Sequence, residues 1–318
     1  MKAHPTLRAA LVAAAFTVAA PAVLAAEFIN VLTGGTSGVY YPLGVSLTQI
    51  YGKVLPDAKA TVQATKASAE NLNLLQAGRG EVAFTLGDTY SLAWQGNEEA
   101  GFKAKLDKLR TIAAIYPNYI HFLASADSGI KTLADLKGKR ISVGAPKSGT
   151  ELNSRAILKG AGLSYADLGK VEYLGYAESV ELIKNRQLDA TLLSSGLGVA
   201  AVRDLATAVK IVVLPIPADM VAKIGDPAYQ TGTIPANTYN GQTADVPTVT
   251  VQNYLATHAG VPADTVYKMT KAMFENQDAM VAAHAAAKAI RKETAASNPP
   301  VPLHPGAEKY YREAGLLK

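Results

Sequence analysis

The feature that most constrains the fold is an alternation of apolar, strand-like runs with amphipathic helical stretches, part of which occurs twice. Residues Ala69–Leu75 (AENLNLL) align without a gap with Ala177–Ile183 (AESVELI), and the same offset aligns Glu81–Phe84 with Asp189–Leu192. In both copies a polar-capped helix leads through an acidic residue into an apolar strand. Two interpretations are open: any two helix–strand units resemble each other to this degree, or the chain holds two lobes of one design.

Strands that alternate with helices along most of the chain indicate an α/β protein with mainly parallel sheets. In open α/β sheets ligands bind at the carboxyl ends of the strands, so two similar lobes facing each other would form a binding cleft. From about Ala263 onward the pattern becomes helical. The tail from Asn298 holds four prolines before one short helix, which we expect to pack onto the body.

The first 25 residues have the order of a secretory signal peptide. Lys2 and Arg8 precede the apolar run AALVAAAFTVAA, and small residues follow it, so cleavage is expected after Ala25 or Ala26. The apolar run is shorter than the ~20 residues that span a bilayer, which disfavours a membrane anchor. We therefore expect an exported protein of the periplasm that has lost residues 1–25.

Composition removes several classes of function. The 318 residues include no cysteine and carry a formal charge of +5. The absence of cysteine excludes disulfides, thiol nucleophiles and thiolate metal sites. The basic residues are scattered, without a block that would follow a nucleic-acid backbone, so we expect no nucleic-acid partner.

A glycine-rich turn follows the first strand-like run, within VLTGGTSGVYYPLG at Val31–Gly44. A P-loop would place a lysine directly after its last glycine, and a dinucleotide fingerprint would space the glycines as Gly-x-Gly-x-x-Gly; this turn has neither pattern. What remains is a turn of exposed amides, with the hydroxyls of Thr36 and Ser37, at the start of a helix. That arrangement favours one carboxylate over a triphosphate.

A second turn of this kind, GAPKSGTEL at Gly144–Leu152, opens another helix with Ser148, Gly149 and Thr150. Serine and threonine at such places often only cap their own helices. For either turn alone, capping and ligand binding are both open interpretations. The occurrence of two such turns favours ligand binding.

The sequence holds no convincing catalytic or metal-binding pattern. His121, His258, His284 and His304 lack metal-ligand spacing, and Ser128–Lys131 has the Ser-x-x-Lys pattern without its companion motifs. We expect no enzymatic activity, no cofactor and no metal. An exported enzyme on the same fold is the less favoured alternative.

Several long motifs resemble the TAXI family, the substrate-binding proteins of tripartite ATP-independent periplasmic (TRAP) transporters. From about Phe28 onward they are, in order, TGGTSGVYYPLG, SAENL, IAAIYPNYIHFLAS, SGIKTLADLKGKRISVGAPKSGTE and IPANTYNGQTADVPTVTV. The resemblance implies an α/β, two-lobed periplasmic-binding-protein (type II) fold. Each lobe would be a mainly parallel sheet flanked by helices, with the ligand in the interlobe cleft.

The same resemblance implies a function. Characterised relatives bind glutamate, glutamine or related small carboxylates, and the loaded protein docks on TRAP membrane permease subunits driven by an ion gradient. A binding protein of an ABC importer or of a sensor kinase is the main alternative. We expect lobe 1 to comprise residues 27–120 and 249–318 and lobe 2 residues 121–248, with a hinge near His121–Ser125 and Val246–Val251.

The motif match also implies ligand-binding residues. They are Thr36, Ser37, Gly38 and Tyr40 in the first turn, Ser68, Glu70 and Asn71 in SAENL, and Ser148, Gly149 and Thr150 in the second turn.

This chain departs from the family pattern at Lys66-Ala67-Ser68, where we expect glycine before the serine. Lys66 either favours a more acidic ligand or points to solvent.

Three further residues are candidates for ligand contact. Asp88 ends the strand-like run EVAFTLGD and either meets a ligand ammonium group or caps the next helix. Ser195, beside Ser194, is placed to add hydroxyl donors. Tyr119, with Tyr116, either stacks on the apolar part of the ligand or lies in the core.

Overall fold

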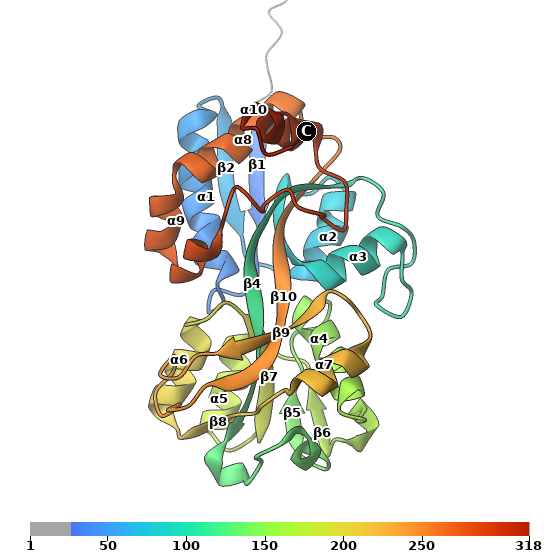
Figure 1. Ribbon diagram of the computed structural model, residues 1–318, viewed down its shortest axis with the longest axis vertical. Helices are drawn as coiled ribbons and strands as arrows, with labels where there is room; N and C mark the ends of the chain where they lie inside the picture. The colour runs from blue at the N-terminus through green and yellow to red at the C-terminus, as the bar shows by residue number, and fades with distance from the viewer. Residues whose placement is uncertain (1–26, 318) are drawn as a thin grey trace, which may run out of the picture.

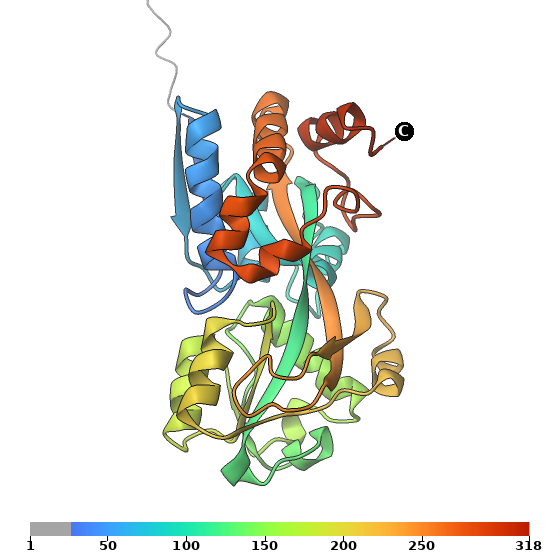
Figure 2. The same ribbon diagram turned by 60° about the vertical axis from the view of Figure 1, so that its left-hand side comes forward.

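Two long strands join the two halves of the molecule, which Figures 1 and 2 show one above the other. The structure, a computed structural model, describes residues 27–317. The predicted signal peptide lies outside the described residues. Each half consists of parallel strands with helices packed against both faces of the sheet (Figure 1).

The upper half begins with three strand–helix units, in which each strand ends at a turn that opens the following helix or leads to it. Their bounds are β1 Glu27–Leu32, α1 Tyr40–Val54, β2 Ala58–Gln63, α2 Ser68–Gln76, β3 Val82–Leu86 and α3 Gly87–Gln95.

The lower half repeats this series and extends it. Its elements are β5 Arg140–Ser142, α4 Gly149–Gly160, β6 Lys170–Glu172, α5 Tyr176–Lys184, β7 Ala190–Ser195, α6 Ala200–Ala208, β8 Ile211–Val213, α7 Ala218–Ile224 and β9 Tyr229–Ile234.

The strand order supports the internal repeat. The upper half has the order β2-β1-β3 and the lower half β6-β5-β7, and all of these neighbours are parallel. Helices α2 and α5 both have nine residues, and they contain the two segments that align in the sequence. Strands β3 and β7 are buried along their whole length, as continuous apolar runs predict. The two halves therefore share one design.

Strands β4, Leu109–Ser125, and β10, Val246–His258, run antiparallel to each other through both halves (Figures 1 and 2). β10 pairs with β9 below and β3 above, and β4 pairs with β7 and β8. The sheet is therefore mixed: three parallel strands in each half flank this antiparallel pair. The pair forms the only β-sheet connection between the halves within the described residues.

The helical stretch expected after Ala263 is broken into shorter pieces. α8 spans Ala263–Glu275, α9 spans Gln277–Ala283, and a single 3-10 helix follows. The final helix α10, Pro305–Glu313, packs onto the upper half as predicted. Its Tyr311 is fully buried and donates a 2.9 Å hydrogen bond to the carbonyl of Ile112 in β4.

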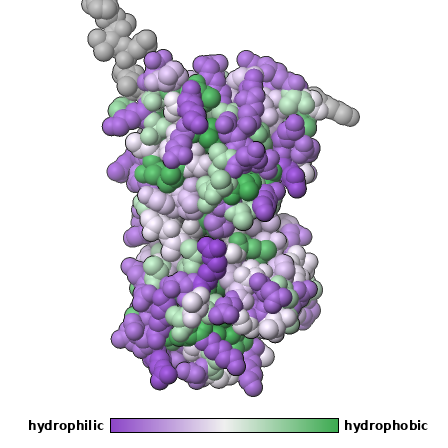
Figure 3. All heavy atoms as spheres, turned by 90° about the vertical axis from the view of Figure 1, so that its left-hand side faces the viewer, coloured by the Kyte–Doolittle hydropathy of each residue, from purple (hydrophilic) through white to green (hydrophobic). Residues whose placement is uncertain are grey.

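One face of the molecule is drawn in Figure 3 and is dominated by hydrophilic residues. Figure 3 shows hydrophilic residues over both halves, with hydrophobic ones in small, separate groups on this face. Among residues 27–317, no helix combines the length and apolar character needed to cross a bilayer.

Candidate functional site

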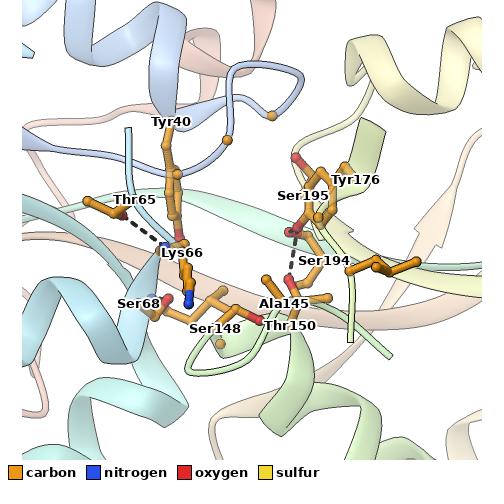
Figure 4. Close-up of a pocket in the computed structure, with 18 of the residues that line it drawn as sticks. Tyr40, Thr65, Lys66, Ser68, Ala145, Ser148, Thr150, Tyr176, Ser194 and Ser195 are labelled. Carbon is orange, nitrogen blue, oxygen red and sulfur yellow. Dashed lines mark hydrogen bonds between the residues drawn. The ribbon is translucent and has the colours of Figure 1, made fainter. Parts of the chain in front are cut away.

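A cavity of about 550 Å³ lies between the two halves, at the carboxyl ends of the parallel strands. Asn118 lines it from β4, and the other lining segments come from both halves, four of them with a counterpart in the opposite half. The upper half contributes residues 34–35, 38–40, 65–68 and 86; the lower half contributes residues 145–146, 148–150, 173–176, 178 and 194–195. In Figure 4, Tyr40, Lys66 and Ser68 lie on one side of this space and Thr150, Tyr176 and Ser195 on the other.

Four helices begin at the cavity wall: α1 and α2 from the upper half, α4 and α5 from the lower half. The residues before α1, α2 and α5 are Val39, Ala67 and Gly175, whose side chains offer no oxygen for capping. Only α4 has a side-chain cap, because the Ser148 hydroxyl accepts from the amide of Glu151 at 3.1 Å. Helix starts carry partial positive charge, so this wall favours anions.

The first amides of these helices are free within the described part of the chain. None of its hydrogen bonds involves the amides of the first two residues of each helix: Tyr40, Tyr41, Ser68, Ala69, Gly149, Thr150, Tyr176 and Ala177. Capping side chains normally satisfy such groups. Here all four helix starts leave their first two amides available to whatever occupies the cavity.

A chain of hydroxyl and amide groups forms the rest of the polar wall. The Tyr176 hydroxyl donates to the carbonyl of Ser194 at 2.6 Å and lies 2.9 Å from the Thr150 hydroxyl. Asn118 donates to the same carbonyl at 2.8 Å. Burial raises the pKa of the Tyr176 hydroxyl to about 12, so this hydroxyl stays protonated at neutral pH.

The Tyr40 side chain, on the upper-half side of the cavity, is held by a hydrogen bond and by ring stacking. Its hydroxyl donates to the side-chain oxygen of Asn253 in β10, and the Asn253 amide donates to Asn118 Oδ1 at 2.6 Å. Its ring stacks on Phe84 with centroids 5.0 Å apart. Burial raises the pKa of the Tyr40 hydroxyl, which is therefore a neutral donor locked to the joining strands.

The halves touch each other around the cavity. The amide of Glu70 in α2 donates to the carbonyl of Lys147 in the lower half at 3.1 Å. A Cβ added to Gly149 would lie 2.7 Å from the Ser68 hydroxyl oxygen and 2.7 Å from a Leu86 methyl carbon, both in the upper half. The structure therefore shows the halves closed against each other.

Asp88 takes part in this contact rather than in the cavity wall. It lies in the first turn of α3, is 1% exposed, and accepts 2.7 Å hydrogen bonds from Asn153 of α4 and Tyr229 of β9. Burial raises the pKa of its carboxyl to about 6. Asp88 is not among the lining residues, and its carboxylate links the two halves. The two roles expected for it, contact with a ligand ammonium group or capping of the next helix, stay predictions.

Seven of the thirteen predicted ligand-binding residues line the cavity. They are Gly38, Tyr40, Ser68, Ser148, Gly149, Thr150 and Ser195. Besides Asp88, the remaining five are Thr36, Ser37, Glu70, Asn71 and Tyr119, none of which appears in the lining.

Each of these five has a local reason for its position. Thr36 is exposed and Ser37 half-buried in the turn, of which only the glycines line the cavity. Glu70 accepts from the amide of Lys66 at 2.6 Å. Asn71 is fully buried and bonds the carbonyls of Thr33 and Phe84. Tyr119 neighbours Asn118 along β4, and successive strand residues face opposite ways.

The sequence interpretation missed several lining residues, notably Thr65, Asn118, Tyr173, Glu178 and, most consequentially, Tyr176. The internal repeat could have identified Tyr176, because the alignment that pairs Ala69 with Ala177 also pairs Ser68 with Tyr176. It likewise pairs Leu86 with Ser194, and both line the cavity. Asn118 has no counterpart in the repeat because it lies in a joining strand.

Lys66 borders the cavity from the loop before α2, and Figure 4 shows its side chain extending from that loop. It is the one basic residue in the lining within residues 27–317. The next residue, Ala67, has φ 70° and ψ −149°, a region that favours glycine. A glycine, as expected at this position from the sequence, would adopt this conformation freely, and this chain holds alanine there under strain.

The candidate catalytic residues do not form a reactive group. His121 is fully buried, its Nε2 lies 2.8 Å from the Tyr239 hydroxyl, and burial lowers its pKa to about 4. Ser128 donates to the carbonyl of Ser125 at 2.7 Å, within a turn. The described residues hold no cluster of three or more His, Asp or Glu side chains with a geometry suited to a metal ion.

Two similar lobes, two joining strands and a cavity at the ends of the parallel strands define a periplasmic-binding-protein fold, which the resemblance had implied. Two solved structures share it. A putative L-cystine ABC transporter protein from Listeria monocytogenes has 15% identity and a TM-score of 0.52, covering 83% of this chain and 98% of its own. A protein from Bordetella bronchiseptica RB50 has 18% identity and a TM-score of 0.50, covering 91% and 81%. The chain belongs to the NMT1-like family, whose model matches residues 31–315.

Proposed function

We propose that the protein is the extracytoplasmic solute-binding subunit of a transporter, which captures a small carboxylate and delivers it to a membrane permease. The observation that supports this most is the meeting of four helix starts, two from each half, around one cavity between the halves. Donors from both halves bind the ligand more completely when the halves are closed. A ligand that binds the closed state better shifts the population toward it.

Closure requires a hinge in the joining strands. β10 pairs with β9 of the lower half as far as Val251 and with β3 of the upper half from Asn253 onward. β4 begins to pair with β7 at Tyr119. We place the hinge at these changes of partner, close to the boundaries 120/121 and 248/249 that the sequence suggested for lobes 1 and 2.

The binding energy would come from charge-assisted hydrogen bonds. A carboxylate oxygen bound by a helix-start amide or a hydroxyl gains about 1.5–3 kcal/mol per bond. Several such bonds, with apolar contact to Val39, Leu86 and Leu174 in the lining, offset the cost of ordering the ligand and both halves. No nucleophile, acid–base pair or metal takes part in this scheme, so we propose binding without catalysis.

The partner is proposed on the resemblance to TAXI proteins, which work with TRAP permeases in the periplasm and bind glutamate, glutamine or related carboxylates. The fold shared with the Listeria ABC-transporter protein keeps an ABC importer as the alternative partner. Uptake assays with the cognate permease in vesicles separate the two, because an ion gradient drives a TRAP permease and ATP drives an ABC importer.

A thermal-shift screen tests the ligand class. The purified protein is heated with amino acids, dicarboxylates, nucleotides and neutral sugars. A ligand at 100 times its dissociation constant stabilises the folded state by about 2.7 kcal/mol, so carboxylates should raise the melting temperature. A rise with a nucleotide or a neutral sugar, and with no carboxylate, contradicts the proposal.

A further inference from the structure

We propose that the ligand is a small dianion without an ammonium group, such as a dicarboxylate, and that the cavity discriminates against amino acids. This inference rests on the proposed function and narrows its ligand class. It follows from which hydrogen-bonding groups of the wall are free and which are already used.

Most of the free groups are donors only, and the free hydroxyl of Ser195 can donate as well as accept. The amides at the starts of α1, α2 and α5 have no partner among the described residues. The Ser195 hydroxyl, on a residue that is 3% exposed and lines the cavity, also has no partner in the described part of the chain. Lys66 adds an ammonium group at the border.

Most side-chain acceptors of the wall already accept a hydrogen bond. Asn118 Oδ1 accepts from Asn253 at 2.6 Å, and Thr65 Oγ1 accepts from the amide of Ala67 at 2.9 Å. Glu178, the one acidic residue in the described lining, is exposed and accepts from the amide of Gly175 at 3.0 Å through one of its two carboxylate oxygens. An ammonium group needs acceptors, and burying it without them is costly.

The donors also lie on two opposite walls. α1 and α2 present theirs from the upper half and α4 and α5 from the lower half, as Figure 4 shows for the residues around them. A ligand with a single carboxylate places its negative charge against one wall and leaves the donors of the other wall without an anion. Two carboxylates, separated by an apolar middle, satisfy both walls at once.

The most decisive experiment compares probes that differ in one group. Calorimetric titration at pH 7.5 uses glutarate against L-glutamate, adipate against 2-aminoadipate, and pentanoate as the monocarboxylate. We expect at least one diacid to bind at least tenfold more tightly than its amino counterpart and than pentanoate. An amino compound that binds as tightly as its diacid overturns the inference while leaving the proposed function intact. If no carboxylate of the set binds, both the inference and the proposed function fail.

Two variants test the assigned groups. Lys66→Met should weaken diacid binding about tenfold, with a smaller loss at high salt because charge screening already weakens the contact. Lys53→Met is the matched control: it removes the same charge from the last turn of α1, about 20 Å along the helix from the cavity.

Glu178→Gln keeps an oxygen that can accept from Gly175, and it removes the only lining carboxylate. We expect it to leave the preference for diacids over amino diacids unchanged. A selective loss of amino-acid binding in this variant would show that Glu178 receives an ammonium group and would overturn the inference.

Discussion

The carboxylate of Asp88 accepts a 2.7 Å hydrogen bond from the hydroxyl of Tyr229, which lies in the opposite half of the molecule. The Asn153 amide donates to the same oxygen at 2.7 Å, and Asn153 Oδ1 has no partner within the described residues. All three side chains are buried. A titratable group thus sits inside the contact that holds the closed halves together.

This position makes stability depend on pH. Burial raises the pKa of Asp88 from 3.8 to about 6, so the neutral carboxyl favours the folded state. The stabilisation of the folded state by the neutral Asp88 carboxyl is fully present below about pH 3.8 and is lost as the pH rises to about 6. The loss corresponds to about 3 kcal/mol.

Asp88→Asn should therefore have an unfolding free energy close to wild type at pH 4 and higher than wild type, by up to ~3 kcal/mol, at pH 7.5. Urea denaturation at both pH values measures it. Asp57→Asn, at an exposed position, is the control and should show no pH-dependent difference. An Asp88→Asn difference that is equal at both pH values contradicts this account.

The strain at Ala67 predicts opposite effects for one substitution at two nearby sites. Ala67→Gly should raise the unfolding free energy by about 1 kcal/mol, because glycine adopts φ 70°, ψ −149° without strain. Ala69→Gly, inside α2, should lower it by about 1 kcal/mol. Chemical denaturation measures both; destabilisation by Ala67→Gly would show that the backbone there is not strained.

Gly149 sets how closely the halves approach. Gly149→Ala places a methyl carbon within 3 Å of Ser68 and Leu86 across the contact, so it should weaken ligand binding tenfold or more. The ligand-free protein relieves the clash by opening, so its unfolding free energy should fall by no more than the cost of opening the contact between the halves. Gly52→Ala, where nothing lies within 4 Å, should keep wild-type affinity. Unaltered binding by Gly149→Ala would mean that closure is not required.

Two serines that the sequence treated alike should now differ. Ser195→Ala removes a free hydroxyl from the cavity wall and should lower affinity about tenfold. Ser37→Ala should leave affinity unchanged, because Ser37 lies outside the lining. Titration calorimetry measures the affinity of both variants. A loss of affinity in Ser37→Ala alone would contradict this prediction and show that the side chains of the first turn bind the ligand.

The sequence predicted the architecture well because its signals are local. The alternation of strands and helices and the repeat between Ala69–Leu75 and Ala177–Ile183 reflect periodicities within single elements. The turns at Gly38 and Ser148 were located for the same reason, since they begin helices at the cavity. The antiparallel pairing of β4 with β10 joins segments that are distant in the chain, and no local sequence pattern predicts it.

Side-chain direction was the part that sequence reasoning could not supply. Ser68 and Asn71 lie three residues apart at the start of α2, yet only Ser68 lines the cavity, while Asn71 bonds buried carbonyls. Asp88 follows strand β3 at the start of α3, and the approach of Tyr229 from the other half covers it. Such outcomes depend on how the two halves meet, which is a property of the assembled fold.

A crystal structure of the protein with bound glutarate or adipate tests the central claim most directly. We predict that one carboxylate lies within hydrogen-bond distance of the first amides of α1 or α2. The other carboxylate should lie at the first amides of α4 or α5, and the halves should be closed. A diacid bound outside this cavity, or bound within it by Lys66 alone while the helix-start amides remain without a partner, would contradict the account.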